Sequence, residues 1–367
     1  MKNSMRTILY LMHIDWNWIK QRPQYIAEGL SKKYRVIVMY KHTYNNVGYQ
    51  HRKSNLVELK EVYTIPNKFS NFKISKKIND AIFTYNVKKE IEENNVSIIY
   101  VTSPKFYKNI PKSFKGKIIY DCMDDHLLLG NSDKKEILSN EKKLLDISDK
   151  VIVTSIHLKE TLIKRYGDAN KNKFTLIRNG FKGPILKINQ MNCVGPKNPT
   201  KIRIGYFGTV SEWFDFNLLE KSLSDFSNIE YKIWGPVDQG ISIPEDLKEK
   251  IKFCGTVEHD ELYRVVSDCD VLIMPFKLNE MIKSVDPVKL YEYINFDKNI
   301  IAIKYPEIER FASFVHFYSN YVEYKNILNF FEKNRDVSYS LKQRASFLRT
   351  NSWENRISKI ETLIEEL

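Results

Sequence analysis

Ser284-Val-Asp-Pro-Val-Lys-Leu-Tyr-Glu-Tyr293, preceded by the apolar run Val271-Leu-Ile-Met-Pro-Phe276 and a polar loop, is the stretch that decides the fold. The pattern predicts a buried strand, a loop and the first turns of a helix. Asp286 suits the cap of that helix, and Pro287 suits its first position, where no backbone N–H is needed. The start of the helix is therefore well marked.

A helix that starts in this way offers free backbone amides to an anion. Val288 and Lys289 occupy its first turn, where the lysine adds a full positive charge. Glu292 follows Asp286 by about one and two-thirds turns, and its carboxylate can accept hydrogen bonds from sugar hydroxyls. A phosphate beside a diol describes a nucleotide diphosphate-sugar, although an ordinary capped helix with a buried glutamate fits the spacing equally well.

This stretch resembles the donor-site helix of the GT-B glycosyltransferases, in which a glutamate after a Pro-x-Lys turn binds the nucleotide ribose. The resemblance is strongest to the teichuronic-acid biosynthesis glycosyltransferases and more distant to the xanthan glucuronosyltransferase. It extends over nearly the whole chain. It implies an α/β fold of two Rossmann-like, doubly wound parallel-sheet domains that face a central cleft, with a C-terminal helix crossing back to the first domain.

Length and composition agree with two domains. The chain has 367 residues, of which 43% are hydrophobic, enough for packed cores. We expect an acceptor-binding domain at 1–181, a linker at 182–200, where glycine and proline interrupt any periodicity, and a nucleotide-sugar-binding domain at 201–345. Residues 346–367 should form the returning helix, because the apolar residues after Asn351-Ser-Trp-Glu354 fall on one helical face.

The sequence indicates a cytoplasmic protein, and the resemblance implies a role in building the bacterial cell envelope. No apolar run approaches the roughly 18 residues that a membrane-spanning helix needs, and the N-terminus leads into a strand rather than a signal peptide. The four cysteines are widely spaced and indicate neither a disulfide framework nor a zinc site.

Excess positive charge is confined to the first third of the chain. Residues 1–120 hold 22 Lys/Arg against 8 Asp/Glu, whereas the remainder holds 36 against 37. The segments 68–78 and 105–117 interleave lysines with aromatic or aliphatic residues, a pattern that suits an anionic lipid surface. Nucleic acid and a merely solvated surface are the alternatives. We find no nucleic-acid-binding motif, so we expect peripheral association with the inner face of the cell membrane and no nucleic acid partner.

The first domain opens with strands at 7–12 and 35–40, joined by a loop and a helix. The loop lacks the GxGxxG of dinucleotide-binding domains. Its segment Trp16-Asn-Trp-Ile-Lys-Gln-Arg-Pro-Gln24 instead resembles an opening of the teichuronic-acid group. That resemblance implies acceptor or cleft roles for His13, Asp15, Trp16, Trp18 and Arg22, while packing of both tryptophans beneath the helix is the alternative.

Acidic residues follow the strand predicted at 117–121, in the segment Cys122-Met-Asp-Asp-His126. Open α/β sheets bind ligands at this end of their strands, and clustered carboxylates raise one another's pKa toward that of a general base. The resemblance assigns the catalytic base to Asp124 first and Asp125 second. His126 is the orienting partner or an alternative base. A metal site and a structural loop are the competing interpretations.

The second domain should begin with the strand at 202–207 and the glycine turn after it. There a bound phosphate can approach the backbone closely. With the resemblance, the expected donor-binding residues are Gly208, Thr209, Gly235, Val257, Asp286, Pro287, Val288, Lys289 and Glu292. Asp268-Cys-Asp270 has the DxD form of a metal motif but precedes its strand, away from the ligand edge, so we expect neither a metal nor a cofactor.

The resulting hypothesis is a metal-independent hexosyltransferase. It would move a hexose from a nucleotide diphosphate-sugar, UDP-linked, to a growing cell-surface polysaccharide or a polyprenyl-linked acceptor, with an aspartate as general base. Whether the anomeric configuration is retained or inverted stays open, since Ser284 stands where many retaining relatives carry a second glutamate. The alternatives are a non-catalytic module that binds sugar nucleotides or nucleic acid, and a GT-B-like epimerase.

Overall fold

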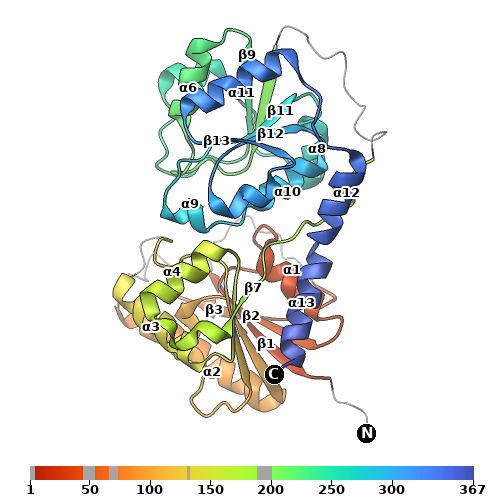
Figure 1. The fold of residues 1–367 in the computed structure, drawn as a ribbon. Helices are drawn as coiled ribbons and strands as arrows, with labels where there is room; N and C mark the ends of the chain where they lie inside the picture. The colour runs from red at the N-terminus through yellow and green to blue at the C-terminus, as the bar shows by residue number, and fades with distance from the viewer. Residues whose placement is uncertain (1–4, 44–53, 66–72, 130–132, 188–200) are drawn as a thin grey trace. The chain divides into compact units, whose positions relative to one another are not determined.

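The computed structural model describes residues 5–43, 54–65, 73–129, 133–187 and 201–367. The chain divides into two compact units (Figure 1). Unit 1 combines Met1–Asn179 with Trp353–Leu367, and unit 2 is Gly180–Ser352. Of the linker expected at 182–200, residues 188–200 lie outside the described residues. The expected start of the returning helix at 346 falls inside α12 (Leu341–Thr350), which belongs to unit 2.

Unit 1 is built on a seven-stranded sheet in the order β3-β2-β1-β4-β5-β6-β7, in which all neighbouring strands are parallel. The strands are β1 (Thr7–Met12), β2 (Arg35–Thr43), β3 (Glu58–Thr64), β4 (Val96–Val101), β5 (Lys117–Cys122), β6 (Lys150–Val153) and β7 (Phe174–Leu176). Because β1 lies between β2 and β4, the sheet is doubly wound. The edge strand β3 was not predicted, since its sequence ELKEVYT lacks an apolar run.

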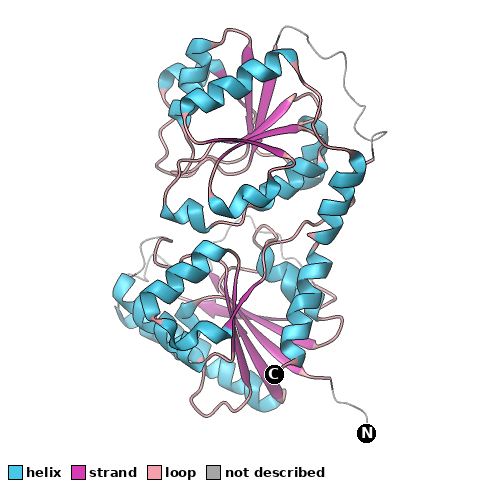
Figure 2. Cartoon of the chain, viewed as in Figure 1, coloured by secondary structure: helices cyan, strands magenta, loops and turns pink. Residues whose placement is uncertain are grey.

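Helices cover both faces of this sheet (Figure 2). They are α1 (Arg22–Leu30), α2 (Lys73–Glu93), η2 (Pro104–Asn109), α3 (Lys134–Ile147), α4 (Ile156–Tyr166), η3 (Asp168–Lys173) and α13 (Trp353–Glu365). Side chains alternate along β1, so Leu9 packs in a core with α2, α3 and α4, and Tyr10 packs in a second core with α1 and α13. The carboxyl ends of all seven strands meet at one edge.

The C-terminal helix α13 packs against α1 within unit 1 (Figure 1). Trp353, Ile360 and Ile364 are buried in the core beneath α1, and Ile357 packs against it, so the predicted apolar face is confirmed. Gly29 of α1 permits this approach, because a Cβ there would lie 2.1 Å from Cδ1 of Ile357. Tyr25 and Trp353 stack with ring centroids 5.2 Å apart.

Unit 2 contains a second parallel sheet, of six strands, in the order β10-β9-β8-β11-β12-β13. The strands are β8 (Ile202–Phe207), β9 (Ile229–Trp234), β10 (Ile251–Phe253), β11 (Val271–Met274), β12 (Asn299–Ile303) and β13 (Val315–Tyr318). The helices are α6 (Phe216–Asp225), α7 (Glu245–Lys250), η4 (His259–Glu261), α8 (Leu262–Val265), α9 (Glu280–Ser284), α10 (Val288–Asn295), η5 (Pro306–Phe311), α11 (Tyr321–Lys333) and α12. This sheet is doubly wound as well, with β8 between β9 and β11, so the predicted pair of Rossmann-like sheets is confirmed.

The basic segment 105–117 is organised differently from the prediction. Phe106 is buried in the core of unit 1, and Tyr107 and Phe114 pack against that core, so the aromatic side chains are not part of a basic surface. Lys108 and Lys112 are exposed. In the other segment, 68–78, residues 68–72 lie outside the described residues. Among the residues that the structure describes, no helix is long and apolar enough to cross a membrane.

Candidate functional site

Two glycine turns follow β8 and β9 at the carboxyl edge of the unit 2 sheet. Gly208 and Gly235 have φ angles of +130° and +136°, a region that side chains with a Cβ rarely adopt. The two turns pack directly together, since a Cβ on Gly235 would lie 2.2 Å from the carbonyl oxygen of Gly208. The amide of Gly208 also donates to the carbonyl of Trp234 at 2.8 Å. Both glycines are therefore required by the backbone geometry.

The side chain of Lys289 lies against Gly208. A Cβ built on this glycine would be 2.2 Å from Cε of Lys289 and 2.6 Å from its Nζ. The ammonium also lies 5.7 Å from the ring centroid of Tyr206 and 5.9 Å from that of Phe276, within the range of cation–π attraction. Desolvation lowers the pKa of Lys289, and the charge of Glu292 opposes this effect. The lysine thus presents a positive charge beside the backbone of the Gly208 turn.

The start of α10 differs from the prediction in two respects. Pro287, rather than Asp286, is at the N-cap position, and Val288, rather than Pro287, is the first helical residue. Asp286 is 3% exposed, and its carboxylate pairs with Arg310. Arg310 also donates to the hydroxyl of Tyr291 at 3.0 Å. The pair joins the segment before α10 to η5, and the cation of Arg310 compensates the buried charge of Asp286.

The other predicted donor residues of unit 2 lie near these turns. Thr209 directly follows Gly208, and its carbonyl accepts a hydrogen bond from the hydroxyl of Tyr206 at 2.8 Å. Glu292 is partly buried on α10, one turn beyond Lys289. Val257 is in the loop after β10, which reaches the Gly235 turn through a 2.8 Å hydrogen bond from the Gly235 amide to the carbonyl of Gly255. The structure brings Gly208, Gly235 and Lys289 together and leaves the base-binding role of Val257 a prediction.

In unit 1, the two candidate aspartates lie on the loop after β5 and have different surroundings. Both oxygens of Asp125 bind the guanidinium of Arg165, at 2.9 and 2.6 Å, and Asp125 is 4% exposed. Asp124 has no such partner among the described residues and is partly buried. Burial raises the pKa of Asp124 to about 6; the charge of Arg22 opposes this rise, and those of Asp121 and Asp125 add to it. The geometry therefore favours Asp124 over Asp125 as the group able to accept a proton.

His126 is 7% exposed, and its Nε2 has no hydrogen-bond partner among the described residues. Burial lowers its pKa to about 3, with further lowering by His13 and Lys105, so the imidazole is neutral near pH 7. The rings of His13 and His126 meet edge to face with centroids 6.0 Å apart. Nδ1 of His13 is 2.8 Å from the hydroxyl of Thr102, at the end of β4. These side chains share the carboxyl edge of the sheet with Asp124.

The loop after β1 divides between core and surface. Trp16 is 4% exposed and packs in the core beneath α1, as the packing alternative predicted, whereas Trp18 is 40% exposed. Asp15 accepts hydrogen bonds from the amide of Asn17 at 2.9 Å and pairs with His42, at the end of β2, at 2.7 Å. Asp15 therefore holds the loop in place.

Arg22 is buried and ion-paired, an arrangement that the sequence did not reveal. Its Nη2 lies 2.8 Å from Oδ1 of Asp121, and its Nε lies 3.0 Å from Oδ2. The hydroxyl of Tyr100 donates to the same carboxylate at 3.0 Å, and Nη1 of Arg22 donates to the carbonyl of Arg178 at 3.3 Å. Asp121 is 99 residues from Arg22 in the sequence and Tyr100 is also far from it, so no local motif points to them.

Both aspartates of the DxD-like segment make contacts within the protein. Asp268 pairs with Lys232 at 2.5 Å, and Asp270 accepts from the amide of Arg203 at 2.9 Å, both before β11. In the described part of the chain, no group of three or more His, Cys, Asp or Glu side chains is arranged to hold a metal ion.

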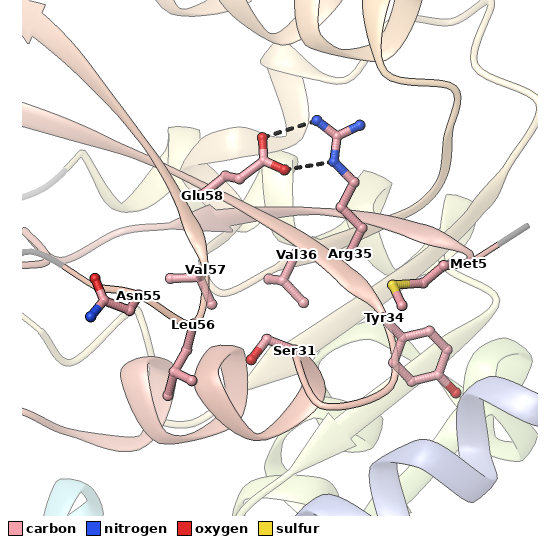
Figure 3. A pocket seen from close by; sticks show the side chains of 9 residues that line it. All are labelled: Met5, Ser31, Tyr34, Arg35, Val36, Asn55, Leu56, Val57 and Glu58. Atoms are coloured by element: carbon pink, nitrogen blue, oxygen red, sulfur yellow. Dashed lines mark hydrogen bonds and ion pairs between the residues drawn. The ribbon is translucent and has the colours of Figure 1, made fainter.

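Unit 1 also has an open pocket beside the amino ends of β2 and β3, whose lining side chains are drawn in Figure 3. Its lining includes Arg35 and Glu58, the first residues of β2 and β3, whose side chains form an ion pair, and the exposed side chain of Leu56. Parallel sheets bind ligands at the carboxyl ends of their strands, so this pocket at the amino ends is separate from the candidate site.

Comparison with known proteins places the chain near glycosyltransferases. No family model matches it. Over 257 residues it is 22% identical to TuaH of Bacillus subtilis (strain 168), whose name assigns it to teichuronic acid biosynthesis as a glycosyltransferase. The aligned part is 65% of this chain and 64% of TuaH, so the chain spans less than two thirds of that relative. The predicted resemblance to the teichuronic-acid glycosyltransferases is confirmed, over 65% of the chain.

Solved structures show the fold more completely. Sucrose-phosphate synthase from Thermosynechococcus elongatus superposes with a TM-score of 0.71 at 14% identity, covering 98% of each chain. Anabaena HepE, solved in complex with UDP and glucose, superposes with a TM-score of 0.61 at 16% identity, covering 99% of this chain and 100% of HepE. The chain has the GT-B fold, as predicted.

Proposed function

We propose that this protein is a GT-B glycosyltransferase that moves a hexose from a UDP-sugar to a growing cell-surface polysaccharide or a lipid-linked acceptor, using neither a metal ion nor a cofactor. The observation that carries this proposal is the ammonium of Lys289, placed against the backbone of Gly208 beside the start of α10. A lysine fixed over a glycine turn at the carboxyl edge of a parallel sheet is suited to a diphosphate.

Unit 2 holds the donor in this proposal. Lys289 and the first amides of α10, from Val288 onward, neutralise the diphosphate, and the turns at Gly208–Thr209 and Gly235 let it approach the backbone. The carboxylate of Glu292 accepts hydrogen bonds from the ribose hydroxyls. The nucleobase contacts the backbone near Val257. Asp286 and Pro287 act indirectly, by fixing the segment from which α10 begins.

Unit 1 binds the acceptor and provides the catalytic base. A hydroxyl of the acceptor attacks the anomeric carbon of the hexose, its proton passes to Asp124, the bond from that carbon to the diphosphate oxygen breaks, and UDP leaves with the electron pair. Asp125 and Arg165 fix the loop that carries Asp124, and neutral His126 orients groups beside it. His13 and Trp18 contact the acceptor, while Asp15, Trp16 and Arg22 position the surrounding elements.

The acceptor class and the location of the protein rest on two observations. TuaH is named for the synthesis of a cell-envelope polysaccharide, and the positive charge of this chain is concentrated in residues 1–120. A lipid-linked acceptor is held at a membrane whose anionic lipids attract such a domain. We therefore infer a cytoplasmic protein attached peripherally to the inner face of the cell membrane.

Nucleotide binding tests the donor half directly. Calorimetric titration with UDP should give a dissociation constant at least about tenfold weaker for Lys289→Met, equivalent to about 1.4 kcal/mol. Lys250→Met is the control, because Lys250 is an exposed lysine of the same unit that directly precedes β10, at the amino ends of the strands and away from the proposed site. Equal affinity of wild type and Lys289→Met would remove the proposed donor site. A thermal-shift comparison of UDP with ADP and GDP then tests the choice of nucleotide, since a ligand of the folded state raises Tm.

A further inference from the structure

Helix α2 carries apolar side chains on two opposite faces. One face packs into unit 1, where Phe83 and Val87 are fully buried. The opposite face carries four large hydrophobic side chains exposed to solvent, which we call the α2 stripe: Ile74 (71% exposed), Ile78 (43%), Ile82 (38%) and Tyr85 (68%). Their spacing of four, four and three residues places them in one row along the helix.

Such a row differs from ordinary exposed hydrophobic residues. The helices α3 and α4 cover the same face of the sheet as α2, and their exposed large hydrophobic side chains, Ile147 and Ile156, stand singly. Single exposed apolar residues are normal on protein surfaces, but contiguous apolar patches mark surfaces that bind another body. The α2 stripe therefore has the character of a surface that binds a partner with an apolar region.

Positive charges flank the α2 stripe. Lys77 and Lys88 are exposed and have no carboxylate partner among the described residues, whereas Lys76 pairs with Glu136. From 73 to 89 the chain has five lysines and a single acidic residue, Asp80, which pairs with Lys41 at 3.2 Å. An apolar row beside uncompensated lysines is complementary to a surface that is apolar inside and negatively charged outside.

We propose that the α2 stripe docks this protein on an anionic lipid bilayer, with α2 lying in the plane of the interface. Ile74, Ile78 and Ile82 enter the boundary between headgroups and acyl chains, Tyr85 places its hydroxyl at the headgroups, and Lys77 and Lys88 contact lipid phosphates. The proposal deepens the proposed function, on which the membrane-borne acceptor rests.

The position of the α2 stripe fits the delivery of such an acceptor. The amide of Ile65, just after β3, donates to the side chain of Asn79 at 2.8 Å, so the middle of the stripe lies near the carboxyl end of that strand. Asp124 follows the carboxyl end of β5 in the same parallel sheet. A lipid-linked acceptor in the bilayer would therefore be at the edge of unit 1 that carries the proposed base.

Vesicle flotation of the full chain tests the proposal. Vesicles of phosphatidylcholine containing phosphatidylglycerol should carry the wild type upward, and vesicles of phosphatidylcholine alone should carry at least about tenfold less. The triple variant Ile74→Ser, Ile78→Ser, Tyr85→Ser should lose at least tenfold of the binding to the anionic vesicles. The matched control is Val322→Ser with Phe330→Ser on α11 of unit 2, which removes exposed apolar side chains elsewhere and should bind as the wild type does.

Three results would overturn the proposal. Undiminished flotation of the triple variant would exclude the α2 stripe, and equal binding to neutral and anionic vesicles would exclude the role of the lysines. If light scattering shows a wild-type dimer that the triple variant dissociates, with vesicle binding unchanged, the α2 stripe is an interface between copies of the chain. UDP affinity is measured in parallel: its retention shows that the variant is folded, and its absence in the wild type would instead refute the proposed function.

Discussion

The guanidinium of Arg22 donates hydrogen bonds from two of its nitrogens to the carboxylate of Asp121, and the two side chains are 3% and 0% exposed. The pair ties the first residue of α1 to β5, immediately before the loop that carries Asp124. Paired planar groups of this kind combine electrostatic attraction with fixed geometry. Arg22 thus positions the loop from inside the protein rather than by meeting a ligand at the surface.

Arg22→Met should reduce the free energy of unfolding by about 3–5 kcal/mol, because it leaves the Asp121 carboxylate buried without its cation. Urea unfolding followed by circular dichroism measures the change. Adding Asp121→Asn to that variant should recover part of the loss, since no buried charge then remains. A stability equal to that of the control Arg264→Met, which alters an exposed arginine, would contradict the structural role.

Asp125→Asn should reduce the stability of the protein, whereas Asp124→Asn should reduce its activity. The first breaks the bidentate pair with Arg165 and should lower the free energy of unfolding by about 1.5–3 kcal/mol. The second should leave the protein stable and able to bind UDP, but abolish acceptor-dependent release of UDP. If Asp125→Asn keeps full stability and loses only turnover, the assignment of the base must be exchanged.

Two pH profiles follow from the raised pKa of Asp124, about 6 against an ordinary 3.8. A general base acts only when ionised, so kcat/KM should rise through pH 6 and then level off. The folded state holds this proton more tightly than the unfolded state, so its stabilising contribution is present below pH 4 and is lost as pH rises through 6. The Asp124→Asn variant has no carboxyl group to ionise at this position, so it does not share this loss. The urea midpoint of the variant minus that of the wild type should therefore increase between pH 4.5 and 7.5. A difference that stays constant over this range would contradict the raised pKa.

Gly208→Ala should displace Lys289 and weaken UDP binding. The added Cβ would lie 2.2 Å from Cε of Lys289, at a φ of +130° that alanine adopts poorly. Gly240→Ala is the matched control, because its φ of +91° imposes backbone strain in the same unit while a Cβ there meets no atom within 4 Å. If both variants lose a similar amount of UDP affinity, the loss in Gly208→Ala is explained by backbone strain and not by displacement of Lys289.

Local patterns made much of unit 2 predictable. The apolar run of β11 and the Pro-x-Lys turn predicted the strand and the start of α10 within a few residues. The polar loop before α10 nevertheless contains α9, a single turn that Asn279 caps. A turn of this length carries too few residues to show a period.

The errors arose where a distant residue competes for a side chain. Asp286 has the sequence position of a helix cap, yet Arg310, 24 residues later, takes its carboxylate. Arg22 and Asp121 are 99 residues apart, and their pairing depends on the order of the strands, which local spacing does not encode. Trp16 and Trp18 are two residues apart in one motif, and only the packing of α1 shows that the first is buried.

The return of α13 to unit 1 has a consequence for how the chain is made. Trp353, Ile360 and Ile364 belong to the same core as residues of β1, so the core of unit 1 cannot be completed until residues 353–367, which follow unit 2 in the chain, have been synthesised. Unit 2 has all of its own residues before that point. During translation β1 must therefore keep part of its apolar surface uncovered while unit 2 is synthesised, until α13 has emerged from the ribosome.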